Sequence, residues 1–590
     1  MHVARFMILM LVVAGCGQNS VAPTPTDTNT DEGGPAVDAL QDQGLAVDSP
    51  IVDSGALQPD APPEDTATDT VDAVEEDTPS GDTEAVETID ASFVEPDSGP
   101  EDTADAVEEC APCVPSAASA QFSMEPDAFA VTPNRTRHNP LKGFMTSYIW
   151  GSPANDFPDS MEFLYLPMAD VWGPDGETFS SGLEPLLEAA ASRGHHVVLR
   201  VYIDYPAKAY GLPPYLTDAV SCQPYTDHGG GCSPDYDHPL LVEAMVGLLT
   251  ALGAHYDGDP RLGALQIGLL GYWGEWHTHP NTDSFASNYT QTAILNAAHT
   301  AFSITQIQVR RPAANSLDLR IGFHDDSFAF STLGDTPWFF LPSLVSAGGG
   351  ERWEEVMIGG ELRPELQSIC FQDDYTLGTN AQDITLCIEQ THASYLLNYK
   401  AFNEAGVGYQ GIERLRAEEA AIHMGYQFEL NAASLKLWGL DHDDETVEAE
   451  VTLTLAQSGV APFYYDLHAA VHAEGSGPVG TSTENLKTLL PGSTKDLTFS
   501  LGRVPLAVVN NPMEVHLTAP ILQPGQRVLL ATHTPGTEED GPTHIGWELG
   551  CNTAEETLPI GAQSGAMEPG CPCICDVDGV LRTCDGSVCP

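Results

Sequence analysis

Between residues 140 and 400, short apolar runs alternate with longer segments of helical periodicity, and this alternation constrains the fold more than any other feature. The runs are rich in β-branched and aromatic residues, and most lack the in/out alternation of half-exposed strands, as parallel strands covered on both faces do. Among the segments between them, Leu183–Arg193 and Leu240–Tyr256 have helical spacing. The predicted strands are Gly143–Trp150, Phe163–Trp172, His196–Ile203, Ala264–Tyr272, Leu319–His324, Val356–Gly360 and Ser394–Asn398.

Seven or eight strand–helix units over this length predict an α/β fold of the (β/α)8 TIM-barrel type, with a doubly wound open sheet as the main alternative. In a barrel, functional residues lie on the loops that follow the strands. The glycine runs Gly229–Gly231 and Gly348–Gly350 do not follow a predicted strand, so neither is a phosphate-binding fingerprint. We therefore expect no nucleotide partner.

The pattern changes after Gly425 to short alternating stretches separated by Gly, Pro, Asn and Asp, which predict an antiparallel β-sandwich. Its predicted strands are Gln427–Leu430, Val447–Ala456, Leu467–His472, Lys495–Leu501 and Val528–Thr532. The expected organisation is a signal peptide in 1–15, a lipidated cysteine with a disordered acidic linker in 16–118, the barrel in 119–424, the sandwich in 425–545 and a cysteine-rich tail in 546–590.

The N-terminus predicts export and a lipid anchor. Arg5 precedes an uncharged apolar run too short to span a bilayer, and the run ends in Val13-Ala14-Gly15-Cys16. This ending resembles the lipobox of bacterial lipoproteins, which implies acylation of Cys16 and stable membrane anchoring by several chains. An ordinary secretory signal is the alternative. Gly17 after the cysteine favours the outer membrane or cell surface within the cell envelope.

Residues 17–118 contain no Lys or Arg and almost no aromatic residue, so they cannot bury a core and are expected to be an extended, disordered spacer. The whole chain has a formal charge of −63. Nucleic acids and anionic membrane surfaces need a positive footprint, so we exclude both as partners. We also expect no cofactor.

Cysteine number fits an oxidising compartment. Setting Cys16 apart from the 13 cysteines leaves an even twelve, as a disulfide framework requires. Nearest-neighbour pairing suggests Cys222 with Cys232 and Cys370 with Cys387, although sequence alone does not establish connectivity. The cysteines after Cys551 predict a small stapled tail, with zinc binding as the weaker alternative.

Carboxylates and aromatic residues gather at the predicted strand ends, as sugar cleavage requires. Glycosidic hydrolysis needs an acid for the leaving oxygen and a second carboxylate, while aromatic faces stack on pyranose rings. Glu275 between two tryptophans is the candidate acid/base, and Glu361 is its candidate partner, with Asp204, Asp325 and Asp326 as rivals. The predicted substrate-binding residues are Trp150, Trp172, Arg200, Asp204, Tyr272, Trp273, Trp276, His277, His324, Asp325 and Asp326.

Other functions fit the same residues. Glu275, His277 and His279 alternate as ligands of a divalent metal would, but Pro280 disfavours this and we expect no metal. Glu275 as a structural carboxylate is a further alternative. So is a non-catalytic surface protein in which the tryptophans bind a glycan, and so is an envelope scaffold without a glycan ligand.

Four stretches resemble a family of secreted bacterial proteins known as domain of unknown function 4832, over roughly residues 130–535. They are Asn139–Phe144, Leu270–Thr278, Ile321–Phe328 and Gly425–Phe428, and Trp273-Gly274-Glu275-Trp276 is the most specific. The resemblance implies a glycosidase-like barrel followed by a β-sandwich, with the acid/base glutamate after the fourth strand. In retaining β-glycosidases of this layout an asparagine precedes that glutamate and holds the sugar 2-hydroxyl, whereas Gly274 stands there in this chain.

Overall fold

The computed structural model describes residues 116–148, 156–403, 407–552, 557–563, 573–582 and 587–589. The predicted signal peptide, Cys16 and nearly all of the acidic linker lie outside these residues, and so does Trp150. The described chain consists of a closed barrel, two antiparallel sheets and a short cysteine-rich tail.

Eight parallel strands close into a barrel, which confirms the predicted (β/α)8 fold over the open sheet. Counted from the first strand in the chain, the order around the barrel follows the order in the sequence. The strands are β3 (Gly143–Ser147), β4 (Met161–Pro167), β7 (His196–Tyr202), β10 (Leu262–Gln266), β11 (Gln306–Val309), β12 (Gly322–Phe328), β13 (Ile358–Leu362) and β14 (Tyr395–Leu397).

The fifth barrel strand, β11, is absent from the sequence-based prediction. It pairs with β10 through Ala264 and Gln306 and with β12 through Val309 and Phe323. All four of its residues are buried, although two are glutamines. Gln308 donates to the carbonyls of Phe323 and Met357. The glutamines of β11 can therefore be buried because their amides are hydrogen-bonded inside the barrel, and they make the sequence of this strand polar.

Helices follow the barrel strands. They include α3 (Glu184–Ser192), α4 (Pro239–Tyr256), α5 (Asn288–Ala301), α6 (Phe340–Ser346), α7 (Ile384–Thr391) and α8 (Gly411–His423). By length and composition α4 could cross a membrane. Its buried residues, such as Met245 and Leu248, belong to the apolar cluster between helices and barrel strands, so α4 is a core helix of the barrel domain.

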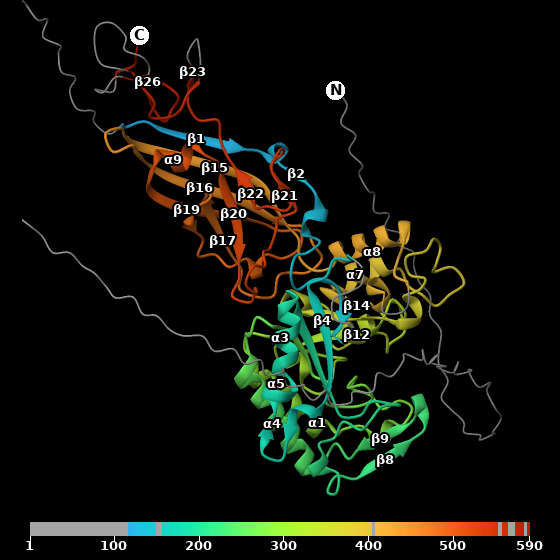
Figure 1. The fold of residues 1–590 in the computed structure, drawn as a ribbon. Coiled ribbons are helices and arrows are strands. Elements are labelled where there is room, and N and C mark those ends of the chain that lie inside the picture. The colour runs from blue at the N-terminus through green and yellow to red at the C-terminus, as the bar shows by residue number, and fades with distance from the viewer. Residues whose placement is uncertain are drawn as a thin grey trace, which may run out of the picture. The chain divides into compact units, whose positions relative to one another are not determined.

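Two antiparallel sheets, built from the chain after the barrel together with β1 ahead of it, confirm the predicted sandwich. The first sheet has the order β1 (Ser119–Met124), β15 (Phe428–Asp441), β16 (Thr446–Gln457) and β19 (Thr494–Pro505), and Figure 1 draws β15, β16 and β19 as neighbouring orange arrows. The second has the order β18 (Pro478–Thr481), β17 (His468–Ala473), β20 (Met513–Thr518) and β22 (Thr543–Ile545). On β16 every second side chain is buried, as expected for a strand with one face on the core.

The disulfides agree with the sequence-based pairing at one of two positions. Cys222 and Cys232 are bonded across the hairpin of β8 (Cys222–Tyr225) and β9 (Gly231–Pro234), which confirms that pair. The pairing of Cys370 with Cys387 is wrong, because both are free, buried thiols. The two lie in an apolar cluster that holds them without a covalent bond.

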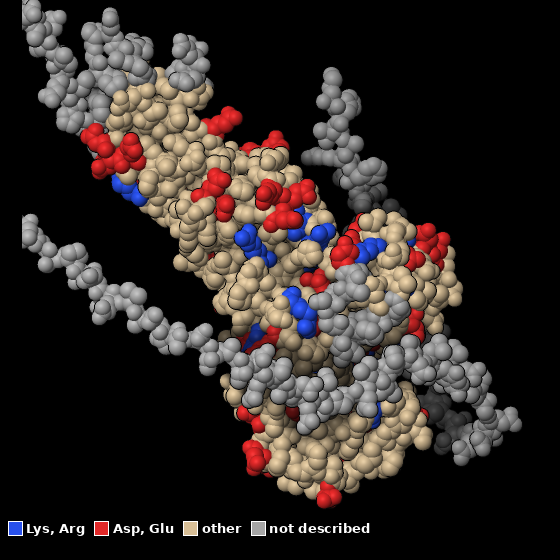
Figure 2. All heavy atoms as spheres, in the orientation of Figure 1, with Lys and Arg blue, Asp and Glu red and all other residues tan. Residues whose placement is uncertain are grey.

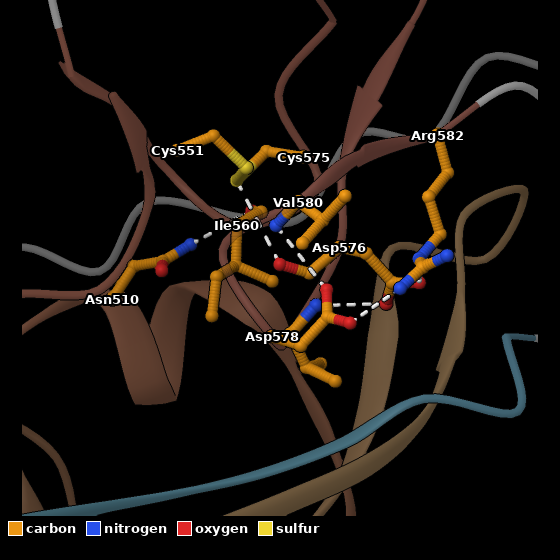
Figure 3. Close-up of a disulfide and its surroundings, with 9 residues drawn as sticks. Asn510, Cys551, Ile560, Cys575, Asp576, Asp578, Val580 and Arg582 are labelled. Atoms are coloured by element: carbon orange, nitrogen blue, oxygen red, sulfur yellow. Dashed lines mark hydrogen bonds and ion pairs between the residues drawn. A yellow bond between two sulfur atoms is a disulfide. The ribbon is translucent and has the colours of Figure 1, made fainter. Parts of the chain in front are cut away.

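The tail is fastened by two further disulfides, Cys551–Cys575 and Cys573–Cys589. Figure 3 shows the Arg582 guanidinium beside the carboxylates of Asp576 and Asp578, and the Arg582 Nε lies 3.1 Å from Asp576 Oδ2. Asp576 also accepts a hydrogen bond from the Ser116 hydroxyl at 2.5 Å. The tail therefore binds the chain where it enters the first sheet.

Charges of both signs are interspersed on the surface. Figure 2 shows no broad patch of Lys and Arg on the face that it draws. Several exposed basic side chains are paired with carboxylates, such as Lys495 with Glu484 at 2.8 Å and Arg503 with Glu448 at 3.2 Å. The visible face thus lacks the basic stripe that nucleic-acid recognition uses.

Candidate active site

The floor of the site is a buried hydrogen-bonded network centred on Arg200 of β7. The Arg200 side chain is 2% exposed; its Nε donates to Gln266 Oε1 at 2.7 Å and its Nη2 to both Asp326 oxygens at 3.0 and 2.9 Å. Gln266 in turn donates to the Tyr395 hydroxyl at 3.0 Å, and that hydroxyl donates to Gln308. These bonds run across the barrel interior and fix the guanidinium in place.

Three consecutive residues of β12 add charge at the same level. His324 Nδ1 lies 3.0 Å from Asp326 Oδ1, and burial lowers the pKa of this histidine to about 4, so it is neutral at pH 7. Burial alone would raise the pKa of Asp326, but Arg200 and His324 hold it well below its usual range. Asp325 accepts from the Thr332 hydroxyl at 2.7 Å and lies 3.2 Å from Arg310 Nη2.

Glu275 is presented by a tight loop after β10. Trp273, Gly274 and Trp276 all have positive φ, at 54°, 67° and 57°. The left-handed region is costly for bulky residues, by about 1 kcal/mol or more each, so the surrounding contacts must hold this loop. The Glu275 amide donates to the Tyr272 carbonyl at 2.8 Å, and a Cβ at position 274 would come within 2.8 Å of the Gly268 backbone. Only glycine therefore fits before Glu275.

The Glu275 carboxylate faces two guanidinium groups without touching them. Its Oε1 lies 3.9 Å from Arg200 Nη1, and its Oε2 lies 3.9 Å from Arg310 Nε and 3.5 Å from His277 Nε2. The side chain is 18% exposed, so solvent reaches it. Separations of 3.9 Å are too long for hydrogen bonds, and each leaves room for one bridging oxygen.

Glu361 enters the site from β13. Burial, followed by the negative charges of Asp326 and Glu275, raises the pKa of Glu361 to about 8, while a hydrogen bond with Tyr399 opposes the shift. The backbone before Glu361 passes close to β12, because a Cβ on Gly360 would come 2.1 Å from the Asp325 carbonyl oxygen. Glu361 is thus a protonated carboxyl at neutral pH, next to charged carboxylates.

The two glutamates lie at the ends of non-adjacent strands and share one neighbour. Glu275 follows β10, the fourth strand of the barrel, and Glu361 lies in β13, the seventh. Burial, and then the charges of Glu361 and Glu275, raise the pKa of Tyr205. The Tyr205 ring packs against those of Tyr165 and Tyr202 at centroid distances of 5.4 and 5.2 Å, so an aromatic cluster lines one side of the site.

Four predicted binding residues lie in other surroundings. Trp276 is 4% exposed and donates from Nε1 to the Ile267 carbonyl at 2.6 Å, so its ring belongs to the barrel core. Tyr272 is fully buried against Tyr225. Asp204 is also buried, and its two oxygens accept from the hydroxyls of Tyr225 and Ser233 at 2.6 and 2.8 Å. Trp172 lies against Gly247 of α4 and donates to Tyr215 at 3.1 Å.

Burial raises the pKa of Asp204 to about 6, yet its role is to fasten the disulfide-bonded hairpin to the barrel. Trp273 contacts residues at the site: its carbonyl accepts from the Tyr165 hydroxyl, and its ring packs against His228 at 4.9 Å. Within the described part of the chain, no three His, Cys, Asp or Glu side chains are arranged to hold a metal ion.

Sequence reasoning missed several residues at the site, above all Arg310. This residue follows β11 directly, and the strand was not predicted because its glutamines hide the apolar pattern. Tyr165 was missed because it lies inside the apolar run of β4, where it reads as a core residue. Tyr399 follows β14 immediately, and the rule that function lies after strand ends would have found it.

The site therefore lies in a closed parallel (β/α)8 barrel, with carboxyl groups after its fourth strand and in its seventh. No family model and no curated protein matches the chain.

Three of the solved structures that resemble the chain are the following. A variant of GH5_18 from Bifidobacterium longum subsp. longum, in complex with Manb1-4GlcNAc, is 13% identical; the match covers 44% of this chain and 69% of that one, with a TM-score of 0.28. The exo-beta-1,4-mannosidase Op5Man5 from an Opitutaceae bacterium is 13% identical; the match covers 44% of this chain and 52% of that one, with a TM-score of 0.29. The beta-amylase catalytic domain from Paenibacillus polymyxa is 11% identical over 48% and 99%, with a TM-score of 0.30. At these scores the barrel assignment rests on the strand order itself.

Proposed function

We propose that the barrel hydrolyses glycosidic bonds of an extracellular polysaccharide, with Glu361 as the proton donor and Glu275 as the charged partner. The observation that carries the proposal is the pair itself: Glu361 in the seventh strand, whose pKa burial raises to about 8, and Glu275 after the fourth strand, which faces two guanidinium groups. Glycosidic cleavage requires an acid that keeps its proton near neutral pH and a second carboxyl group.

The roles differ from those expected from the sequence, where Glu275 was the candidate acid. Desolvation by Trp273 and Trp276, which flank Glu275 in sequence, would favour its acid form, but Trp276 turns into the barrel wall and guanidinium groups lie near the carboxylate instead. Glu361 instead has the buried, negatively charged surroundings that favour a neutral acid.

Two of the four tryptophans that a non-catalytic glycan-binding protein would use are held elsewhere. Such a protein would use exposed aromatic faces as stacking platforms. Trp276 is buried, and Trp172 is held by α4 and Tyr215, so neither offers its face at the site. The unequal pair of glutamates has no evident use in binding alone.

The test is hydrolysis of a polysaccharide and nitrophenyl-glycoside panel by the full chain and by Glu275→Gln and Glu361→Gln. We expect each change to lower kcat at least about 100-fold, as loss of acid–base groups does. Glu365→Gln is the matched control, because Glu365 follows Glu361 closely but is 51% exposed and paired with Arg363 at 2.9 Å. Equal turnover by wild type and both site variants, or none by the wild type, would refute the proposal.

We also propose that the protein is anchored in the cell envelope through acylated Cys16, on the strength of the lipobox-like Val13-Ala14-Gly15-Cys16. Labelling of cells with a clickable fatty acid should mark the wild type and not Cys16→Ser. A labelled Cys16→Ser protein, or an unlabelled wild type, would contradict the anchor.

A further inference from the structure

Arg310 is a buried cation with one unused donor at the centre of the site. Its side chain is 4% exposed; Nη2 lies 3.2 Å from Asp325 Oδ1, and Nη1 donates to the His324 carbonyl at 3.4 Å. Its Nε is buried and has no hydrogen-bond partner among the described residues. Leaving a buried charged donor without a partner is costly, so a native group of this kind calls for an explanation.

The unused Nε lies near two carboxylate oxygens at distances too long for hydrogen bonds. Glu275 Oε2 is 3.9 Å away and Asp326 Oδ2 is 3.6 Å away. An oxygen placed about 2.9 Å from both Arg310 Nε and Glu275 Oε2 makes two hydrogen bonds of normal length across this gap. Asp326 already accepts two bonds from Arg200, whereas the nearest basic groups to Glu275 stand at 3.5 Å or more. The gap beside Glu275 is therefore the one open to a ligand.

A hydroxyl group fits this gap better than an anion. The Arg310 Nε–H can donate to the hydroxyl oxygen, and the hydroxyl hydrogen can be donated to Glu275 Oε2. An anion would accept from Arg310 but would face the negative charges of Glu275 and Asp326 at the same time.

Resting on the proposed glycosidase function, we infer that Arg310 is a specificity-determining residue: its Nε and Glu275 Oε2 together bind the hydroxyl next to the carbon at which the sugar is cleaved. In a retaining reaction the charged carboxylate lies against that anomeric carbon, and this inference takes Glu275 in that role. A hydroxyl within hydrogen-bond reach of the same carboxylate is the one on the neighbouring ring carbon, C2. The substrate class is thus a glycoside with a free 2-hydroxyl.

The experiment compares two substrates in each enzyme: the 4-nitrophenyl glycoside that the wild type cleaves fastest, and its 2-deoxy analogue. We expect the wild type to prefer the hydroxylated substrate about 10–100-fold in kcat/KM, as loss of a hydrogen bond to a charged group predicts. Arg310→Lys and Arg310→Met should each reduce this preference about tenfold, because lysine has a methylene and methionine a methyl group where Arg310 has its Nε donor. The preference is a ratio within one preparation, so a partly unfolded variant does not distort it.

Arg352→Gln is the control, since this guanidinium pairs with Glu355 at 3.0 Å before β13 begins. A wild-type preference near one, or a preference that Arg310 variants leave unchanged while Glu275→Gln and Glu361→Gln abolish turnover, would overturn this inference and leave the proposed function standing. If the wild type cleaves no glycoside of the panel, the proposed function and the inference about Arg310 both fail.

Discussion

Replacing Glu361 by glutamine should make the folded protein less sensitive to pH, and this can be measured without a substrate. A carboxyl group with a pKa of about 8 in the folded protein and 4.5 when unfolded binds its proton more tightly in the folded state. Its burial therefore has no cost below pH 4.5, and the cost grows as the pH rises toward 8, because the unfolded chain alone releases the proton.

The pKa difference sets the magnitude. Between pH 5 and 7 linkage predicts that the wild type loses about 2 kcal/mol of unfolding free energy relative to Glu361→Gln. This figure is reduced from the full effect of the pKa difference because Glu361 keeps some exposed surface. Glutamine keeps the size and polarity of the protonated acid but does not titrate. Urea unfolding at pH 5, 6, 7 and 8 measures the difference.

Glu365→Gln should track the wild type at every pH, since Glu365 is exposed. If the difference in unfolding free energy between wild type and Glu361→Gln is the same at pH 5 and pH 7, then Glu361 is ionised at neutral pH and cannot be the proton donor.

Other residues lead to further tests of stability and packing. Against the effect of burial, hydrogen bonds to Asp159 and Glu162 raise the pKa of His195 to about 9, so its stabilising contribution disappears as the pH rises through 9. His195→Gln should therefore lower the free energy of unfolding by about 3 kcal/mol at pH 7 and by much less near pH 10. Urea unfolding at both pH values checks this. Burial lowers the pKa of Lys142 to about 7. In the same assay the free energy of unfolding of the wild type should therefore rise by about 2 kcal/mol relative to Lys142→Met between pH 7 and 9. Parallel pH profiles of the two proteins would refute the lowered pKa. Trp276→Ala should destabilise the barrel by about 3–5 kcal/mol, seen as a lower urea midpoint, while a neutral effect would place the ring outside the core. Without any reductant, Cys370 and Cys387 should be alkylated once the protein is denatured but not while it is folded, because both are buried free thiols. A disulfide-linked pair of peptides containing them in mass spectrometry would contradict their free state.

The barrel was predictable because most of its strands are apolar enough to read as buried and parallel. Strand β7, with His-Val-Val-Leu-Arg-Val-Tyr, shows this in seven residues that are all buried. Strand β11 could not be found by the same rule, because its glutamines satisfy buried hydrogen bonds that depend on strands far away in the sequence. Missing β11 also meant missing Arg310.

The carboxylates of the site were predictable because they lie in or after the last residues of apolar strands, but their surroundings in the folded protein were not. Trp273 and Trp276 flank Glu275 in sequence, and adjacency suggested an apolar pocket around the acid. The positive φ of Gly274 and Trp276 instead turns the Trp276 ring away, which only the folded loop reveals. Likewise, the pKa of Glu361 depends on Asp326 and Glu275, which come from other strands.

Strand β15 gives the molecule a defined response to mechanical load. Its 14 residues extend for about 45 Å, from Phe428 just after α8 to Asp441. Ser116 donates to Leu440 near the far end, and β1 then runs antiparallel back along β15 from Trp438 to Ala433. Tension between the chain before residue 116 and the barrel acts along these strands, so it shears their hydrogen bonds together instead of opening them one at a time. The Ser116–Asp576 bond and the Cys551–Cys575 crosslink stand at the point where such a pull arrives.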